Sequence, residues 1–269
     1  MRSPAVAVAM ACIATCVLLL VCIPLLLQGR RALAVAPSLH VINVADARGD
    51  SRRSALRSAL AGIDYVLIEA HLKEDITDEA LRAVHERQKQ WLAHERNVDK
   101  KQHVPLTQGE VALSLSHGRS YRALLASQEP WRVVAEDDIR VAEGFRECLH
   151  DVLTRLPPDF YWLKLEYQNG TAPECHRRRR PDECRIEPYD AFTRPIDCAA
   201  LYVVSRAGAA LLLEANGQGR TWLNADGAMD QYWLELCMGR PCRGRTYHVV
   251  PQLAWQDRSF GNDGSHRSG

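Results

Sequence analysis

Short apolar runs alternate along this chain with longer stretches whose apolar residues recur at helical spacing. The apolar runs are rich in β-branched or aromatic residues and end at polar or turn residues, which predicts strands. The expected strands cover residues 40–44, 65–68, 131–135, 160–165, 199–204 and 246–251. The expected helices cover residues 51–60, 77–96, 107–129, 143–156 and 206–215. The strand–helix–strand order at the start indicates a βαβ unit, and 269 residues can hold one α/β domain of ordinary size.

The N-terminal segment is the most apolar part of the chain, since residues 5–27 carry no charge. About 23 residues in a helix span roughly 34 Å, enough for the hydrocarbon core of a bilayer. We therefore expect residues 1–28 to be a type II signal anchor and residues 29–38 a stem. Two arginines follow the span, against the positive-inside rule, and residues 32–36 resemble a cleavage site, so a cleaved signal peptide stays open. Both alternatives place the remaining chain in the lumen of the endoplasmic reticulum or Golgi.

The cysteine content agrees with an oxidising compartment. Six cysteines follow the apolar segment, at positions 148, 175, 184, 198, 237 and 242. An even number suggests disulfides, and proximity along the chain favours Cys175 with Cys184 and Cys237 with Cys242. Asn169-Gly170-Thr171 is an N-glycosylation sequon. The formal net charge of +1 gives no global attraction to nucleic acid.

Three consecutive carboxylates, Glu136, Asp137 and Asp138, follow the predicted strand at residues 131–135. Like charges a few Å apart raise each other's pKa unless a cation neutralises them. Hard divalent cations take oxygen ligands, and ligands of open α/β sheets bind beyond the carboxyl ends of strands. The triplet therefore predicts a metal site for a phosphorylated ligand. The alternative is an acidic turn that caps a helix beginning at Ile139.

The block around this triplet resembles glycosyltransferase family 25, which includes lipooligosaccharide and procollagen galactosyltransferases. The matching pieces are Leu106-Thr107-Gln108-Gly109-Glu110, Ser116-His117 and Ala135-Glu136-Asp137-Asp138. Looser matches follow the order of the family: Ile42, Asn43, Arg48, Arg52 and Arg53, then residues 205–212, 224–233 and 246–251, then Gln256. The resemblance covers residues 39–260 and leaves residues 261–269 as a tail, which we expect to be flexible.

The resemblance implies a GT-A-type nucleotide-sugar-binding α/β sandwich with a mostly parallel central sheet. It also implies transfer of galactose from UDP-galactose, with inversion at the anomeric carbon. A Mn²⁺ or Mg²⁺ ion held by Glu136 and Asp138, with Asp137 in support, would stabilise the departing diphosphate. Inversion needs a base for the acceptor hydroxyl, and we expect Asp230 in that role, with Asp226 as the second candidate. Asp226 could equally be a helix cap, and Asp230 could bind donor or metal instead.

Further candidates come from the first strand and from the helix before the triplet. In the family the loop after the first strand borders the nucleotide, which nominates Asn43, Arg48 and Arg52 for the donor. His117 could bind donor phosphate or pack inside the helix. Glu110 is a donor-side candidate by position, although Thr107 three residues earlier makes it a capping-box residue first. His248 is a further possible metal ligand.

Other functions stay open at this point. The chain has Ala112-Leu113 where the family usually has Gly-Cys, so a catalytically inactive nucleotide-sugar or glycan-binding protein of the secretory pathway is the alternative. Glucose or N-acetylglucosamine could replace galactose as the donor sugar, because that choice depends on pocket shape. A metal-dependent phosphoesterase is disfavoured by the lack of His-rich metal spacing. The acceptor could be a glycoprotein or another glycan.

Overall fold

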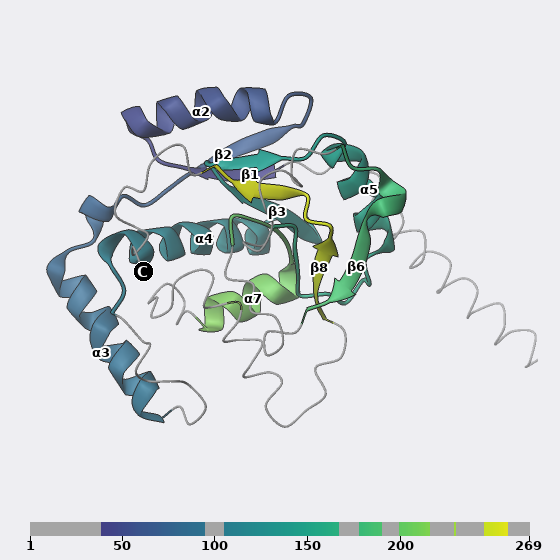
Figure 1. The fold of residues 1–269 in the computed structure, drawn as a ribbon. Helices are drawn as coiled ribbons and strands as arrows, with labels where there is room; N and C mark the ends of the chain where they lie inside the picture. The colour runs from purple at the N-terminus through teal and green to yellow at the C-terminus, as the bar shows by residue number, and fades with distance from the viewer. Residues whose placement is uncertain are drawn as a thin grey trace, which may run out of the picture. The chain divides into compact units, whose positions relative to one another are not determined.

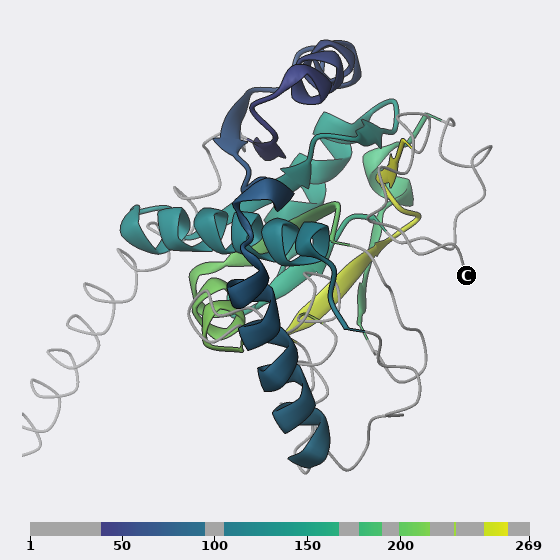
Figure 2. The ribbon, with the colours of Figure 1, turned by 90° about the vertical axis from the view of Figure 1, so that its left-hand side faces the viewer.

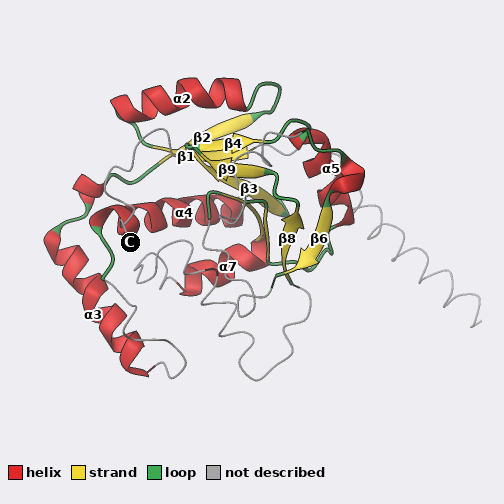
Figure 3. Cartoon of the chain, in the orientation of Figure 1, coloured by secondary structure: helices red, strands yellow, loops and turns green. Residues whose placement is uncertain are grey.

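The computed structural model describes residues 39–94, 105–166, 178–189, 199–215, 229 and 245–257. Its helices are α2 (Ala47–Ala59), α3 (Asp78–His94), α4 (Gln108–Ala126), α5 (Phe145–Arg155) and α7 (Arg206–Ala215), with 3-10 turns η1 (Lys73–Asp75) and η2 (Pro181–Glu183). Its strands are β1 (Leu39–Asn43), β2 (Tyr65–Glu69), β3 (Trp131–Glu136), β4 (Ile139–Val141), β5 (Trp162–Lys164), β6 (Arg185–Pro188), β7 (Leu201–Ser205), β8 (Thr246–Val250) and β9 (Ala254–Gln256). Figure 3 shows how helices and strands follow one another. Every strand and helix expected from the sequence is present, with ends shifted by a few residues at most.

Seven strands form one sheet in the order β2-β1-β3-β7-β5-β8-β6. Strand β1 pairs in parallel with β2 and β3, and β5 pairs in parallel with β8. Strands β7 and β6 run in the opposite direction. This confirms a mixed α/β domain with a mostly parallel central sheet. The carboxyl ends of β1, β3 and β5 therefore meet at one edge of the sheet, where open α/β sheets bind their ligands.

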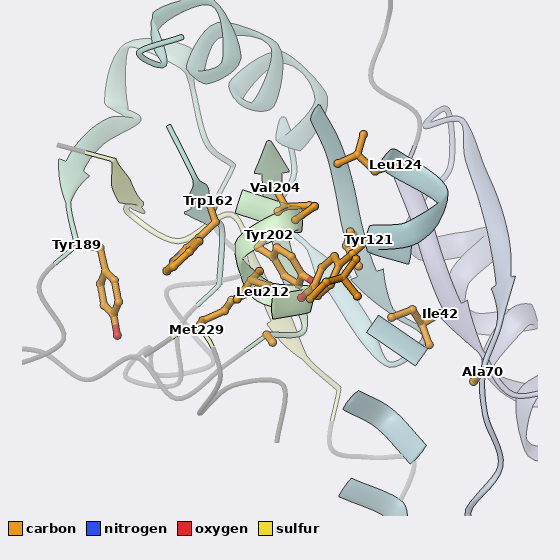
Figure 4. Packing of buried hydrophobic residues seen from close by; sticks show 14 residues of the cluster. Ile42, Ala70, Tyr121, Leu124, Trp162, Tyr189, Tyr202, Val204, Leu212 and Met229 are labelled. Carbon is orange, nitrogen blue, oxygen red and sulfur yellow. The ribbon is translucent and has the colours of Figure 1, made fainter. Parts of the chain in front are cut away.

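Helices cover the two faces of this sheet. Helices α4 and α7 lie on one side of it, and α2 lies on the other (Figures 1 and 2). Side chains alternate between the faces of a strand, so Val134, Val204 and Trp162 all point toward α4 and α7. They pack in one cluster with Tyr121, Leu124, Tyr202 and Leu212 (Figure 4). Burying each large apolar side chain contributes roughly 1.5–3 kcal/mol, and this cluster fixes α4 against the strands.

Both ends of α4 are held by side chains. At its start, Thr107 Oγ1 accepts the amide of Glu110 at 3.2 Å, and the Glu110 carboxylate accepts the amide of Thr107 at 2.7 Å. At its end, the Arg206 guanidinium of α7 donates to the carbonyl oxygens of Leu124 and Leu125, each at 2.8 Å. These contacts satisfy backbone groups that a helix leaves without an internal partner. The capping box predicted for Glu110 is therefore confirmed.

The structure excludes one alternative that the sequence left open and adds short strands that the sequence did not predict. Residues 139–141 form strand β4, which pairs antiparallel with β9, so the acidic triplet does not cap a helix that begins at Ile139. The β-branched residues Ile139 and Val141 find a partner more than a hundred residues away, which local spacing does not reveal. The polar, arginine-rich sequence of residues 166–190 predicts a loop, but residues 185–188 form edge strand β6 beside β8.

Several predictions concern residues that the structure does not describe. They are the anchor and stem at residues 1–38, the sequon at residues 169–171, the tail at 261–269, and Cys175, Cys198, Cys237 and Cys242. Among the helices within the described ranges, none combines the length and apolar character needed to cross a bilayer. The N-terminal anchor therefore stays a prediction from the sequence.

The capping box gives a direct stability prediction. Thr107→Ala should destabilise the protein by about 1 kcal/mol, because alanine offers no oxygen to the amide of Glu110. In a domain of this size that lowers the Tm by roughly 2–4 °C. Thr107→Ser keeps the oxygen and should melt close to the unchanged protein. Thermal unfolding followed by circular dichroism measures both, and equal Tm values for the Ala and Ser variants would contradict the cap.

Candidate functional site

The acidic triplet lies at the carboxyl edge of the sheet, next to the end of β1. Ile42 of β1 is the register partner of Glu136 in the parallel β1–β3 pair. The next residues, Asn43 and Asp137, therefore leave their strands side by side. Strand alternation sends Glu136 and Asp137 to opposite faces, so neighbouring carboxylates meet different surroundings.

Asp137 is held on both of its oxygens. Asn43 Nδ2 donates to Asp137 Oδ2 at 2.8 Å, and Arg52 Nη1 of α2 donates to Asp137 Oδ1 at 2.8 Å. Arg53 donates to the Asn43 oxygen from the same helix turn. The Asp137 side chain is only 6% exposed, and its charge is compensated by the partly buried guanidinium of Arg52 and by the Asn43 amide. Asp137 thus links the end of β3 to β1 and α2 through hydrogen bonds, and we call this set of contacts the joint.

Close packing of the loop after β1 allows this joint. Asn43 Nδ2 also donates to the Gly49 carbonyl oxygen at 3.2 Å, while the Asp46 side chain caps α2 by accepting the Gly49 amide at 2.9 Å. A Cβ atom at Gly49 would lie 1.8 Å from the Val44 carbonyl oxygen, so only glycine fits there. Of the residues predicted to border a nucleotide, Asn43 and Arg52 thus come together around Asp137. The side chain of Arg48 lies outside the described residues.

Glu136 and Asp138 converge on a single amide. Gln256 Nε2 of β9 donates to Asp138 Oδ2 at 3.1 Å and approaches Glu136 Oε2 at 3.5 Å. The antiparallel β4–β9 pair aligns Ile139 with Gln256, and the Asp257 amide donates to the Asp138 carbonyl oxygen at 2.5 Å. The two-stranded sheet of β4 and β9 therefore positions Gln256 beside the triplet. The sequence pointed to Gln256 only as a weak match near the end of the chain.

Asp138 is the most perturbed carboxyl in this group. Burial, followed by the nearby charges of Glu136 and Asp137, raises the pKa of Asp138 to about 8. Its Oδ1 atom is buried and has no hydrogen-bond partner among the described residues. A buried carboxylate oxygen of this kind costs free energy unless a proton or a cation occupies it. No group of three or more His, Cys, Asp or Glu side chains within the described ranges has metal-binding geometry, so Glu136 and Asp138 could supply two protein ligands rather than a full shell.

His117 connects this edge with the core. The His117 ring is 1% exposed on α4. Its Nε2 lies 3.3 Å from Glu136 Oε1, and its Nδ1 lies 2.7 Å from the Tyr202 hydroxyl. The Tyr202 hydroxyl in turn lies 2.7 Å from the Tyr121 hydroxyl, and Figure 4 shows both tyrosine rings inside the apolar cluster. The structure therefore places His117 where it orients Glu136.

A buried polar row continues from Tyr202 across the sheet. Strand register aligns Tyr202 of β7 with Lys164 of β5, Lys164 with His248 of β8, and His248 with Glu187 of β6. Lys164 is fully buried, and its Nζ lies 4.9 Å from the centre of the Tyr189 ring. His248 Nε2 lies 3.8 Å from Glu187 Oε2. His248 thus belongs to this row and joins no metal-binding group among the described residues.

Sequence reasoning missed Lys164 and Tyr202 as polar members of the site. Lys164 was visible as one cation inside an otherwise apolar and aromatic strand, and a buried Lys is rare without a compensating partner. Tyr202 gave no such signal, because a tyrosine in a strand is ordinary. The two aspartates nominated for catalysis, Asp226 and Asp230, lie outside the described residues.

Comparisons with known proteins agree with the resemblance noted in the sequence. A family model described as glycosyltransferase family 25 (LPS biosynthesis protein) matches residues 37–229, which is well over half of the chain. The match includes β1, α4 and the acidic triplet, and it ends before β8 and β9. A search of curated proteins found no match.

The raised pKa of Asp138 predicts how stability varies with pH. In the unfolded chain this carboxyl ionises near its ordinary pKa of 3.8, whereas in the folded protein it keeps its proton up to about pH 8. Between these values the unfolded state binds fewer protons, so folding stability should fall as pH rises, by up to about 1.4 kcal/mol per pH unit. Asp138→Asn has no ionisable group at this position and therefore removes this contribution to the pH dependence of stability.

Urea unfolding with a chelator present, at several pH values from 4 to 8, measures the difference. The stability of Asp138→Asn relative to the unchanged chain should increase steadily with pH. Glu143→Asn is a suitable control, since Glu143 is an exposed carboxylate outside the triplet. Parallel stability curves for the unchanged chain and Asp138→Asn would contradict the raised pKa.

Proposed function

The chain belongs to glycosyltransferase family 25, and we propose that it transfers galactose from UDP-galactose to a hydroxyl group of a glycoprotein or glycan acceptor. The transfer inverts the anomeric carbon and uses a divalent cation. Family membership supports glycosyl transfer in general, a nucleotide-sugar donor and an acceptor. Galactose, UDP, inversion and metal are the finer parts of the proposal. A GT-A-type arrangement of the α/β domain goes with them.

The observation that supports this function best is the convergence of Glu136 and Asp138 on Gln256 at the carboxyl edge of β3. Two oxygen-bearing side chains, one with an unpaired buried oxygen within the described part of the chain, fit a Mn²⁺ or Mg²⁺ ion that takes its other ligands from phosphate and water. Such an ion supplies Lewis-acid stabilisation of the negative charge on the departing diphosphate. In this proposal Glu136 and Asp138 hold it.

The other residues of the site act through position and charge. Asp137 is engaged by Asn43 and Arg52, so it supports the turn and leaves direct binding to its two neighbours. Asn43 and Arg52 therefore serve the donor indirectly, by fixing that turn. His117 orients the Glu136 carboxylate, and Gln256 donates to Asp138 and approaches Glu136.

The acceptor side depends on residues outside the described ranges. We assign the general base to Asp230, with Asp226 as the second candidate, because a carboxylate of suitable pKa can take the proton of an acceptor hydroxyl. Membrane attachment through residues 1–28 and a lumenal location in the Golgi or endoplasmic reticulum complete the proposal. They rest on the uncharged segment at residues 5–27.

Asp138→Asn tests the role of the acidic edge. Loss of a charged ligand should lower metal-dependent turnover by about 100-fold or more, because Lewis-acid stabilisation amounts to several kcal/mol and each 1.4 kcal/mol is tenfold in rate. The assay follows UDP release from UDP-galactose by the full chain in detergent, with Mn²⁺ added. Glu86→Gln, on the exposed face of α3 and far from the triplet in sequence, is the matched control.

The outcomes separate the proposal from its alternatives. Normal turnover by a folded Asp138→Asn variant would overturn the metal assignment. Release of UDP from UDP-glucose but not from UDP-galactose would change the donor sugar. If the unchanged chain binds UDP-galactose but releases no UDP with any acceptor tried, the chain is a nucleotide-sugar-binding protein.

Asp230→Asn tests the acceptor side. Turnover should fall strongly, by roughly 100-fold or more, because general acid–base catalysis contributes about that much. Calorimetric titration with UDP and Mn²⁺ then assigns the role. An unchanged Kd for UDP supports a base, whereas a weakened Kd places Asp230 on the donor or the metal. Asp226→Asn is run in parallel, and unchanged turnover in Asp230→Asn alone would move the base to Asp226.

A further inference from the structure

Two buried cysteines, Cys148 and Cys184, come together where α5 packs against the segment before β6. Cys148 lies on the buried face of α5, among Phe145, Leu149 and Val152. Cys184 follows η2 and immediately precedes edge strand β6. Both side chains are buried, at 0% and 2% exposure, and both are free thiols in this structure.

The two thiols form a short hydrogen-bonded chain. The Cys148 thiol donates to the Cys184 sulfur, and the Cys184 thiol donates to the Arg180 carbonyl oxygen at 3.4 Å. The two thiol side chains therefore lie within hydrogen-bonding reach of each other. Helix α5 also packs directly on η2, so the segments that carry the two cysteines are already side by side, as a disulfide requires.

The backbone on either side of the pair is clamped. Near the start of α5, the Arg179 amide donates to the Glu143 carbonyl oxygen at 2.8 Å. Gly144 has a positive φ of 82°, and a Cβ there would lie 2.3 Å from the Arg179 carbonyl oxygen, so the two segments touch at a position that only glycine tolerates. At the other end, Arg155 Nη2 donates to the Cys184 carbonyl oxygen at 2.6 Å. The two cysteines therefore lie between two contacts that hold α5 against the segment around η2.

We propose that Cys148 and Cys184 form a disulfide that fastens the η2–β6 segment to α5. A disulfide oxidant, such as oxidised glutathione, is the co-reactant. The thiolate of one cysteine attacks a sulfur of the oxidant and releases one glutathione thiolate. The second cysteine thiolate then attacks the mixed disulfide and releases the other. Two electrons pass to the oxidant, and the two cysteine protons end on the two glutathione thiols.

This pairing differs from the one expected from spacing, in which Cys184 bonds to its nearer neighbour Cys175. It also indicates when the bond forms. Burial raises the pKa of Cys148 and of Cys184, so few thiolates exist in the folded domain, and the oxidant has no access to them. The bond therefore forms during folding and then persists as a structural link. It closes a loop from residue 148 to residue 184 that includes β5 and η2 and ends just before edge strand β6.

Peptide mapping tests the connectivity. The full chain is unfolded in reductant, refolded in a mixture of reduced and oxidised glutathione, quenched in acid, alkylated and digested with trypsin without reduction. Mass spectrometry should recover residues 147–155 joined to residues 180–185, and the pair should separate on reduction. Recovery of Cys184 joined to Cys175 or to any other cysteine would overturn the proposal, as would alkylated Cys148 and Cys184 in chain that has regained its native circular dichroism.

Thermal melting separates a covalent link from ordinary packing. Either Cys148→Ser or Cys184→Ser removes the whole bond, so each single variant and the double variant should lose the same amount, on the order of 10 °C in Tm. In reductant the four proteins should melt within a few degrees of one another. Losses that add in the double variant, or that persist unchanged in reductant, would show that the two thiols only pack together.

Discussion

The buried contact of Asp137 with Asn43 and Arg52 is the interaction on which the rest of the site depends. It joins β1, α2 and β3 at the point where all three approach the carboxyl edge of the sheet. A carboxylate that is 6% exposed would carry a large desolvation penalty without these partners. With one of three consecutive charges compensated in this way, Glu136 and Asp138 can remain close together and point away from the joint.

Strand geometry places the three carboxylates in three different surroundings. Glu136 is the last residue of β3 and faces α4, where its carboxylate lies 3.3 Å from His117 Nε2. Asp137 points to the opposite side and meets α2. Asp138 has left the strand and lies beside Gln256 of β9. A motif that reads as a uniform negative cluster in the sequence is therefore divided into a carboxylate beside α4, a carboxylate bound to β1 and α2, and a carboxylate beside β9.

The sequence predicted those elements that depend only on residues close together along the chain. The capping box at Thr107 and Glu110 lies within one helical turn, and the strand before the triplet is a continuous apolar run, so both are visible in the sequence. The β4–β9 pair joins residues more than a hundred positions apart, and no local spacing contains that information. The sequence likewise nominated Arg52 for the donor and left His117 open between donor phosphate and packing inside the helix. It did not reveal that both side chains contact the acidic triplet.

The polar row under α4 follows from how the sheet is assembled. Tyr202, Lys164 and His248 are neighbours only because the strand order inserts β7 and β5 between β3 and β8. Only Lys164 stands out in the sequence, as a cation inside an apolar strand, and it is the strand register that aligns the three residues on the face that also carries Glu136. Burial of Lys164 beside a ring and of His117 between Tyr202 and Glu136 fixes these groups, because moving them would leave polar atoms without partners in a low-dielectric interior. The core therefore fixes the position of the acidic edge.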